Sequence, residues 1–145
     1  MNAQSNLGGL LGKSSRLIAN HFNNDLNVYS LTIAQWTLLA VLWNKDHLSQ
    51  KALQDELLKD KASVTSLVTY LIKNGFISKV QSVNDKRSFI VSLTQKGKDI
   101  QKATVAIARE NIMLAAQGIH QEDLETTTRV LTQIINNLTK PFYKE

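Results

Sequence analysis

The chain has 145 residues, of which 43% are hydrophobic and 20% charged, and its net charge is +5. This composition is typical of one globular domain with a real core, and the absence of cysteine excludes disulfides, thiolate metal sites and cysteine-based redox switches. The start of the chain lacks the basic residues and unbroken apolar run of a signal peptide, and no stretch reaches the roughly 18 apolar residues of a membrane span, so we expect a cytoplasmic protein.

The first two predicted elements are helices. Apolar residues recur at helical spacing from Leu7 to Leu26, which predicts a helix with one apolar stripe over about 7–27. Thr32 is a suitable N-cap for a second helix. The body of that helix, Ile33 to Trp43, is apolar on most faces, so we expect it to be buried.

Two short helices follow, with Ser49 and Asp60 as their predicted N-caps. The second of them has an apolar face made by Val64, Leu67, Val68 and Leu71, and its opposite face carries Lys61, Ser63, Ser66, Thr69 and Tyr70. Asn74-Gly75 ends this helix, because glycine readily adopts the left-handed conformation of a C-cap. A pair of short helices joined by a tight turn is typical of a helix-turn-helix.

The hydrophobic period then changes. Residues 76–82 and 88–93 alternate and are rich in β-branched residues, and they flank a polar turn at 83–87, which predicts a two-stranded hairpin. Thr94 is the predicted N-cap of the next helix, Gly118 marks a break, and a final helix is predicted over about 121–139.

These elements predict a mainly α fold with a small β-hairpin wing. We expect a single domain over 1–145, in which a winged helix-turn-helix lobe at about 32–100 lies between dimerisation helices at about 7–27 and 100–140. Amphipathic helices at both ends of a short chain favour a two-fold dimer. Ordinary packing within one chain is the alternative.

The excess positive charge is local. Residues Ser49 to Lys102 hold ten Lys or Arg and five Asp or Glu, whereas the rest of the chain has seven of each sign. A basic block on a folded domain indicates a polyanionic partner, and a merely solvated basic surface is the alternative.

The hairpin tip carries a second candidate contact. Asp85 and Arg87 are two residues apart and so lie on the same side of an extended chain. The carboxylate can therefore orient the guanidinium for a minor groove, whose negative potential favours arginine. Lys86 and Lys79 would add phosphate contacts. An exposed Asp–Arg pair at a turn, with no such role, is the alternative.

Several stretches together resemble the MarR family of bacterial regulators. They are Leu31-Thr32-Ile33-Ala34-Gln35-Trp36, Leu48-Ser49-Gln50-Lys51-Ala52-Leu53, Ala62-Ser63-Val64-Thr65-Ser66-Leu67-Val68, Leu71-Ile72-Lys73-Asn74-Gly75-Phe76-Ile77, and Asn84-Asp85-Lys86-Arg87 followed by Val91-Ser92-Leu93-Thr94-Gln95-Lys96-Gly97. The D-x-R wing is followed by a leucine–threonine pair and then a glycine, and this order is unlikely to arise by chance. The resemblance covers nearly the whole chain, although the end helices match only in pattern.

The resemblance implies a homodimeric transcription regulator, most often a ligand-responsive repressor, that binds a pseudo-palindromic site in double-stranded DNA. It implies that the second short helix lies in the major groove and that Arg87 reaches a minor groove with Asp85 orienting it. It also implies that Ser49 and Gln50 approach a phosphate at the N-terminus of the first short helix. The expected DNA-binding residues are Ser49, Gln50, Lys51, Lys61, Ser63, Thr65, Ser66, Thr69, Asp85, Lys86 and Arg87.

The sequence departs from the family pattern at three positions. Members often have an arginine where Ser66 stands and an arginine or asparagine where Tyr70 stands, and Leu58 stands where the turn often has glycine. The loss of two basic side chains predicts weaker phosphate contact from the second short helix. We therefore expect the wing and three lysines to contribute more to DNA binding; the lysines are Lys51, Lys59 and Lys61.

A small aromatic or phenolic effector is also implied by the resemblance. The expected lining residues are Ser14, Ile18, His21, Phe22, Tyr29 and Trp36, although a core role explains Phe22 and Trp36 better than ligand contact does. The three histidines are scattered, so we expect no metal site.

Two other function classes fit the sequence less well. An enzyme is disfavoured, because the chain lacks a phosphate loop, a nucleophile elbow and a metal signature. A winged helix that contacts proteins and does not bind DNA directly is kept open by Ser66 and Tyr70, whereas the basic wing argues against it.

Overall fold

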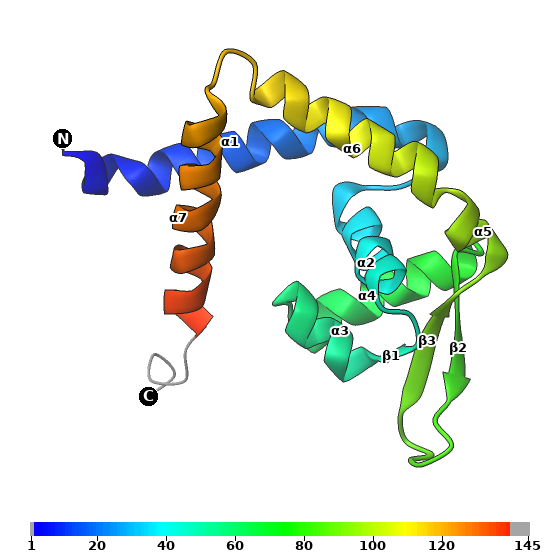
Figure 1. The fold of residues 1–145 in the computed structure, drawn as a ribbon. Helices are drawn as coiled ribbons and strands as arrows, with labels where there is room; N and C mark the ends of the chain where they lie inside the picture. The colour runs from blue at the N-terminus through cyan, green and yellow to red at the C-terminus, as the bar shows by residue number, and fades with distance from the viewer. Residues whose placement is uncertain (1, 140–145) are drawn as a thin grey trace. The chain divides into compact units, whose positions relative to one another are not determined.

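The structure, a computed structural model, describes residues 2–139. These residues form two compact units, divided between Asn111 and Ile112. The second unit contains the end of α6 and α7 (Gln121–Thr139). The first unit contains the following elements in chain order (Figure 1): α1 (Ala3–Leu26), the 3-10 turn η1 (Asn27–Tyr29), α2 (Ile33–Asn44), β1 (Leu48–Ser49), α3 (Gln50–Leu57), α4 (Lys61–Lys73), β2 (Ile77–Gln81), β3 (Phe89–Leu93), α5 (Gln95–Asp99) and most of α6 (Gln101–Ala115).

The predicted N-caps are confirmed, and each has a clear cause. The side chains of Thr32, Ser49, Asp60 and Thr94 each accept a hydrogen bond from the backbone N–H three residues later. Such a bond satisfies one of the free N–H groups at the start of a helix. At Thr32 the side chain of Gln35 completes a capping box.

The wing is the antiparallel hairpin of β2 and β3, whose register runs from Ile77 opposite Leu93 to Gln81 opposite Phe89. Figure 1 shows the hairpin extending beyond the neighbouring helices, with its closing loop at the far end. The prediction of two strands was incomplete, because β1 pairs with the other edge of β3. A two-residue strand is too short to carry an alternating pattern, so no periodicity could have predicted it.

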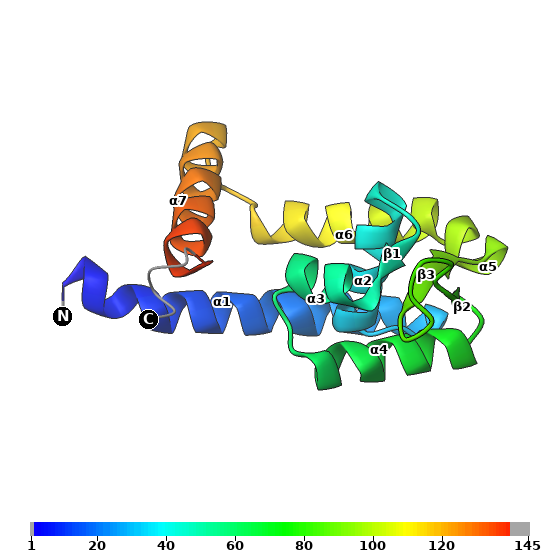
Figure 2. The ribbon, with the colours of Figure 1, turned by 90° about the horizontal axis from the view of Figure 1, so that it is seen from below.

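The core of the first unit lies where α2 meets α3, α4 and the sheet. Leu38, Leu39 and Leu42 of α2 are fully buried, as the apolar character of this helix predicted. The other buried apolar residues come from the end of α1, the following loop, α3, α4 and the sheet: Phe22, Leu26, Leu31, Leu53, Val64, Val68, Leu71, Phe76, Ile77 and Val91. Figure 2, seen from below, shows α4 beside the wing at the edge of this unit.

The single helix predicted after Thr94 is wrong, because the structure divides it into α5 and α6 at Ile100. The indole N–H of Trp43 donates to the carbonyl of Gly97 at 2.9 Å, and in an uninterrupted helix that carbonyl accepts from the residue four positions later. Gly97 itself packs closely, since a Cβ at this position would lie 2.1 Å from the carbonyl oxygen of Phe76. Packing against the lobe therefore interrupts the helix.

The second unit confirms the predicted break and final helix. Gly118 has φ +80°, a conformation that favours glycine, and α7 begins at Gln121. None of the α7 residues is buried, and its apolar side chains Val130, Leu131, Ile135 and Leu138 are exposed. Within residues 2–139, no single helix combines the length and the apolar character that crossing a membrane requires.

Candidate nucleic-acid interface

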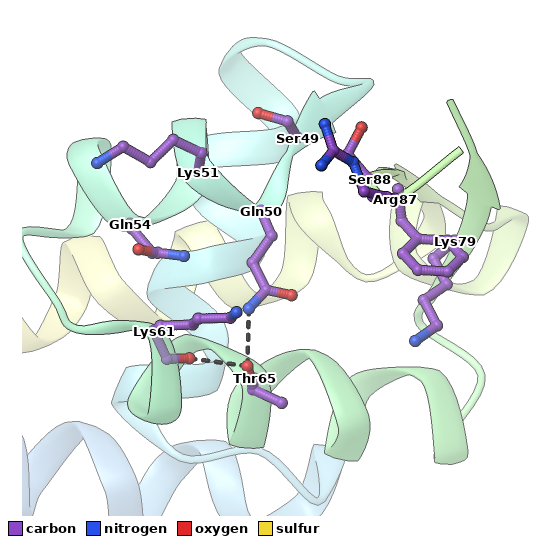
Figure 3. A pocket seen from close by; sticks show the side chains of 10 residues that line it. Ser49, Gln50, Lys51, Gln54, Lys61, Thr65, Lys79, Arg87 and Ser88 are labelled. Atoms are coloured by element: carbon purple, nitrogen blue, oxygen red, sulfur yellow. Dashed lines mark hydrogen bonds between the residues drawn. The ribbon is translucent and has the colours of Figure 1, made fainter. Parts of the chain in front are cut away.

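A hollow of about 540 Å³ opens between α3, the first turns of α4 and the wing (Figure 3). We call it the basic groove; its lining residues are Ser49, Gln50, Lys51, Gln54, Lys61, Thr65, Lys79, Arg87, Ser88 and Phe89. They include four cations and, within the described residues, no carboxylate. The structure thus brings together six residues that the sequence analysis expected to bind DNA, from positions as far apart as Ser49 and Arg87.

The start of α3 uses its polar side chains internally. The Ser49 hydroxyl accepts from the N–H of Ala52 at 3.1 Å and caps the helix. The Gln50 amide nitrogen donates to the Thr65 hydroxyl oxygen at 2.7 Å and thereby links α3 to α4. Lys51 pairs with the Asp55 carboxylate at 3.0 Å, and both side chains are exposed, so a phosphate can compete for this lysine.

The outer face of α4 is polar, as predicted. Lys61, Ser63, Ser66 and Thr69 are exposed. The Asp60 carboxylate caps the helix, and its pKa lies below the usual 3.8. The main cause is the pair of hydrogen bonds that it accepts from the side chain and backbone of Ser63, and the positive charge of Lys59 adds to the effect.

The placement of Tyr70 corrects the sequence analysis. Its side chain is half-buried against the core instead of lying on the exposed face of α4. Its hydroxyl donates to the carbonyl of Ser30 at 2.5 Å, where the chain turns with φ 58°. Tyr70 therefore supports the loop before α2. Because position 70 does not lie on the exposed face of α4, the lack of a basic residue there does not lower the positive charge of that face.

The wing tip has the geometry expected of Asp85 and Arg87. The Asp85 carboxylate accepts from the backbone N–H of Arg87 at 2.9 Å and lies 3.4 Å from its Nε. The Arg87 side chain is 93% exposed. Lys86 is exposed too, and its carbonyl accepts from the Gln81 side chain, which braces the loop.

Three groove residues were missed by the sequence analysis, namely Gln54, Ser88 and Phe89. The ammonium of Lys79 lies 4.7 Å from the centre of the Phe89 ring, so this exposed aromatic side chain holds a cation at the side of the groove. The two residues lie on adjacent strands, and only the strand register brings them together.

The residues expected to bind an effector differ in how far they are buried. Phe22 belongs to the core, and its ring lies 4.9 Å from that of Trp36 in an edge-to-face contact. Ile18 and Tyr29 are half-buried, whereas Ser14 and His21 are exposed on α1. The indole Nε1 of Trp36 is buried and has no acceptor among the described residues. In residues 2–139, no three His, Asp or Glu side chains gather as metal ligands do.

Comparison with known proteins gives consistent matches. A family model described as transcriptional regulator SarA/Rot matches residues 20–104. The organic hydroperoxide resistance transcriptional regulator of Bacillus subtilis is 27% identical over 95% of this chain and 92% of its own length.

Solved structures show the same fold. A MarR protein from Peptoclostridium difficile superposes with a TM-score of 0.90 at 22% identity, over 96% of this chain and 91% of the other. Reduced AbfR, whose structure was solved bound to DNA, superposes with a TM-score of 0.73 at 22% identity, over 93% and 95%. The expected MarR-like winged-helix fold is confirmed.

Proposed function

The chain belongs to the SarA/Rot family of transcriptional regulators, and on that premise we propose that it binds double-stranded DNA through the basic groove and the wing. The observation that carries this proposal is the gathering of Lys51, Lys61, Lys79 and Arg87 around one hollow. Phosphates supply much of the affinity of DNA for proteins, and cations converging from three parts of a fold match a charged backbone better than scattered surface lysines do.

In the proposed complex, α4 lies in the major groove with Ser63, Ser66 and Thr69 on its exposed face. Arg87 inserts into the adjacent minor groove, and Asp85 keeps the guanidinium oriented. Lys61 and Lys86 contact phosphates, as does Lys51 after it leaves Asp55. The N-terminus of α3 contributes its free N–H groups to the same backbone.

We further propose that the regulator acts in the cytoplasm as a homodimer on a pseudo-palindromic operator, most simply as a repressor. The dimer is supported by apolar side chains that remain exposed on the end helices. They are Leu7, Leu10 and Leu17 of α1, Ile112, Met113 and Leu114 of α6, and Val130, Leu131, Ile135 and Leu138 of α7. Unpartnered apolar faces of this kind are typical of dimer interfaces.

The proposed effector is a small aromatic anion. Its support is the Trp36 indole, whose buried N–H lacks an acceptor that a carboxylate or phenolate oxygen would supply. An effector releases DNA only if it binds more tightly to the conformation that DNA disfavours.

The test is fluorescence anisotropy of the wild type and Arg87→Ala on the DNA upstream of the protein's own gene, across a salt series. We expect wild-type affinity to fall steeply as salt rises, and the Arg87→Ala variant to lose at least tenfold in affinity while it stays folded by circular dichroism. Salicylate added to the wild-type complex should lower the anisotropy, and Trp36→Phe should weaken this response.

A winged helix that contacts proteins gives the opposite result. It would bind no duplex even at low salt although the chain is folded. Equal affinity of the wild type and Arg87→Ala would leave DNA binding intact and remove the minor-groove role of the wing.

A further inference from the structure

The hydroxyl group of Thr65, which lines the basic groove, makes two hydrogen bonds. It donates to the carbonyl of Lys61 at 2.8 Å, and it accepts from the Gln50 amide at 2.7 Å (Figure 3). A hydroxyl has one hydrogen to donate, so this side chain cannot donate to a base without giving up its bond to the helix.

The second bond distinguishes Thr65 from an ordinary helical threonine. Donation to the carbonyl four residues earlier is common in this chain and is made also by Thr37, Thr104, Thr127, Thr128, Thr132 and Thr139. Within residues 2–139, Thr65 is the member of this group whose oxygen also accepts from a side chain of another helix. Rotation about its Cα–Cβ bond would break both contacts, so its rotamer is held.

The held rotamer decides which group Thr65 offers to a ligand. Its oxygen faces Gln50 and Lys61, and Figure 3 shows its terminal carbon pointing away from both bonds. Thr65 is exposed, so its methyl group is available on the face of α4. In the major groove, a threonine methyl is suited to apolar contact with the C5 methyl of thymine.

We propose that Thr65 is a specificity-determining residue that recognises thymine through its methyl group, and that Gln50 is the positioning residue that holds it. This inference rests on the proposed function, because it requires α4 to lie in the major groove. It gives Gln50 a role that differs from the phosphate contact expected from the sequence.

Deoxyuridine tests the contact directly, because it differs from thymidine only by the missing C5 methyl. A duplex that the wild-type protein selects from a random pool is remade with each thymidine of one half-site replaced in turn. We expect one position at which the wild type loses about fourfold in affinity, the effect of removing one buried methyl group. Deoxyuridine at the other positions should change affinity less than twofold.

Variants then assign the methyl contact to its residue. Thr65→Ser keeps the hydroxyl and loses the methyl, so it should bind the thymidine and deoxyuridine duplexes equally. Gln50→Met keeps the size of the side chain but cannot donate to Thr65, and it should reduce the fourfold ratio to less than twofold. This ratio is independent of any general loss of affinity, and circular dichroism confirms that each variant is folded.

The outcomes separate the two proposals. If no duplex is selected and binding is absent at low salt, the proposed function fails and this inference fails with it. If binding is tight and salt-dependent but Thr65→Ser still discriminates fourfold, the thymine is read by another side chain and the inference alone is overturned. An unchanged ratio in Gln50→Met would remove the positioning role of Gln50.

Discussion

The Asp85–Arg87 pair uses charge for orientation more than for stability. The two partners at the wing tip are exposed, and exposed ion pairs contribute little to folding. Their value lies in holding the guanidinium before DNA arrives, which reduces the entropy that binding would otherwise cost. Asp60 acts on stability instead, because its carboxylate accepts from the N–H of Ser63 and caps α4.

We predict that the contribution of Asp60 depends on pH. Its pKa is lower in the folded chain than the usual 3.8, so its stabilising effect is present above that value and is lost as the pH falls through the lowered pKa. Urea unfolding followed by circular dichroism should show Asp60→Ala less stable than the wild type at pH 7, and the difference should shrink in acid. Asp60→Asn, which can cap without a charge, should lack this acid-dependent part. An Asp60→Ala deficit that is the same at pH 7 and pH 3 would contradict the prediction.

The turn between α3 and α4 places a leucine in the left-handed region of the backbone. Leu58 ends α3 in the left-handed region, with φ 52° and ψ 44°, and the residue is 63% exposed. A leucine here gains little from burial and carries the steric cost of that conformation. The presence of Leu58 in place of the expected glycine therefore strains the backbone of this turn.

We predict that Leu58→Gly stabilises the fold by about 1 kcal/mol relative to Leu58→Ala. Both variants lose the leucine side chain, and only glycine relieves the left-handed backbone. The check is the midpoint of urea unfolding at neutral pH for the two variants. Equal midpoints would mean that the turn is not strained.

At the scale of the whole molecule, the end helices α1, α6 and α7 carry exposed apolar side chains. In α7, no residue is buried and the exposed apolar residues recur on one face. A second copy of the chain is the partner that would cover them in a homodimer. The same association would present two wings and two copies of α4 to DNA, which is the symmetry of a pseudo-palindromic operator.

We predict that Leu131→Glu prevents dimerisation, because it places a charge within the apolar face of α7. Gln133→Glu is the matched control, since it adds the same charge to the opposite side of the same helix. Sedimentation equilibrium at micromolar concentration should give twice the chain mass of 16.2 kDa for the wild type and the control, and the chain mass for Leu131→Glu. A dimeric Leu131→Glu variant would show that α7 does not form the interface.

The sequence by itself determined the helices apart from the division of α5 from α6, the N-caps, the wing and the basic character of the region from Ser49 to Lys102. These features are local, since a capping side chain, a hydrophobic period and a turn each depend on residues close together in the chain. The D-x-R pair was predictable for the same reason, and its contact is made across two residues.

Only the tertiary structure decided how distant residues share the site. The pairing of β1 with β3, the inward placement of Tyr70 and the break at Ile100 each depend on a partner at least 40 positions away. The bond from Gln50 to Thr65 joins two helices, and its geometry turns a hydroxyl inward and leaves a methyl group outward. Composition and periodicity describe residue types along one element, whereas such contacts follow from how elements pack, so they could not be read from the chain alone.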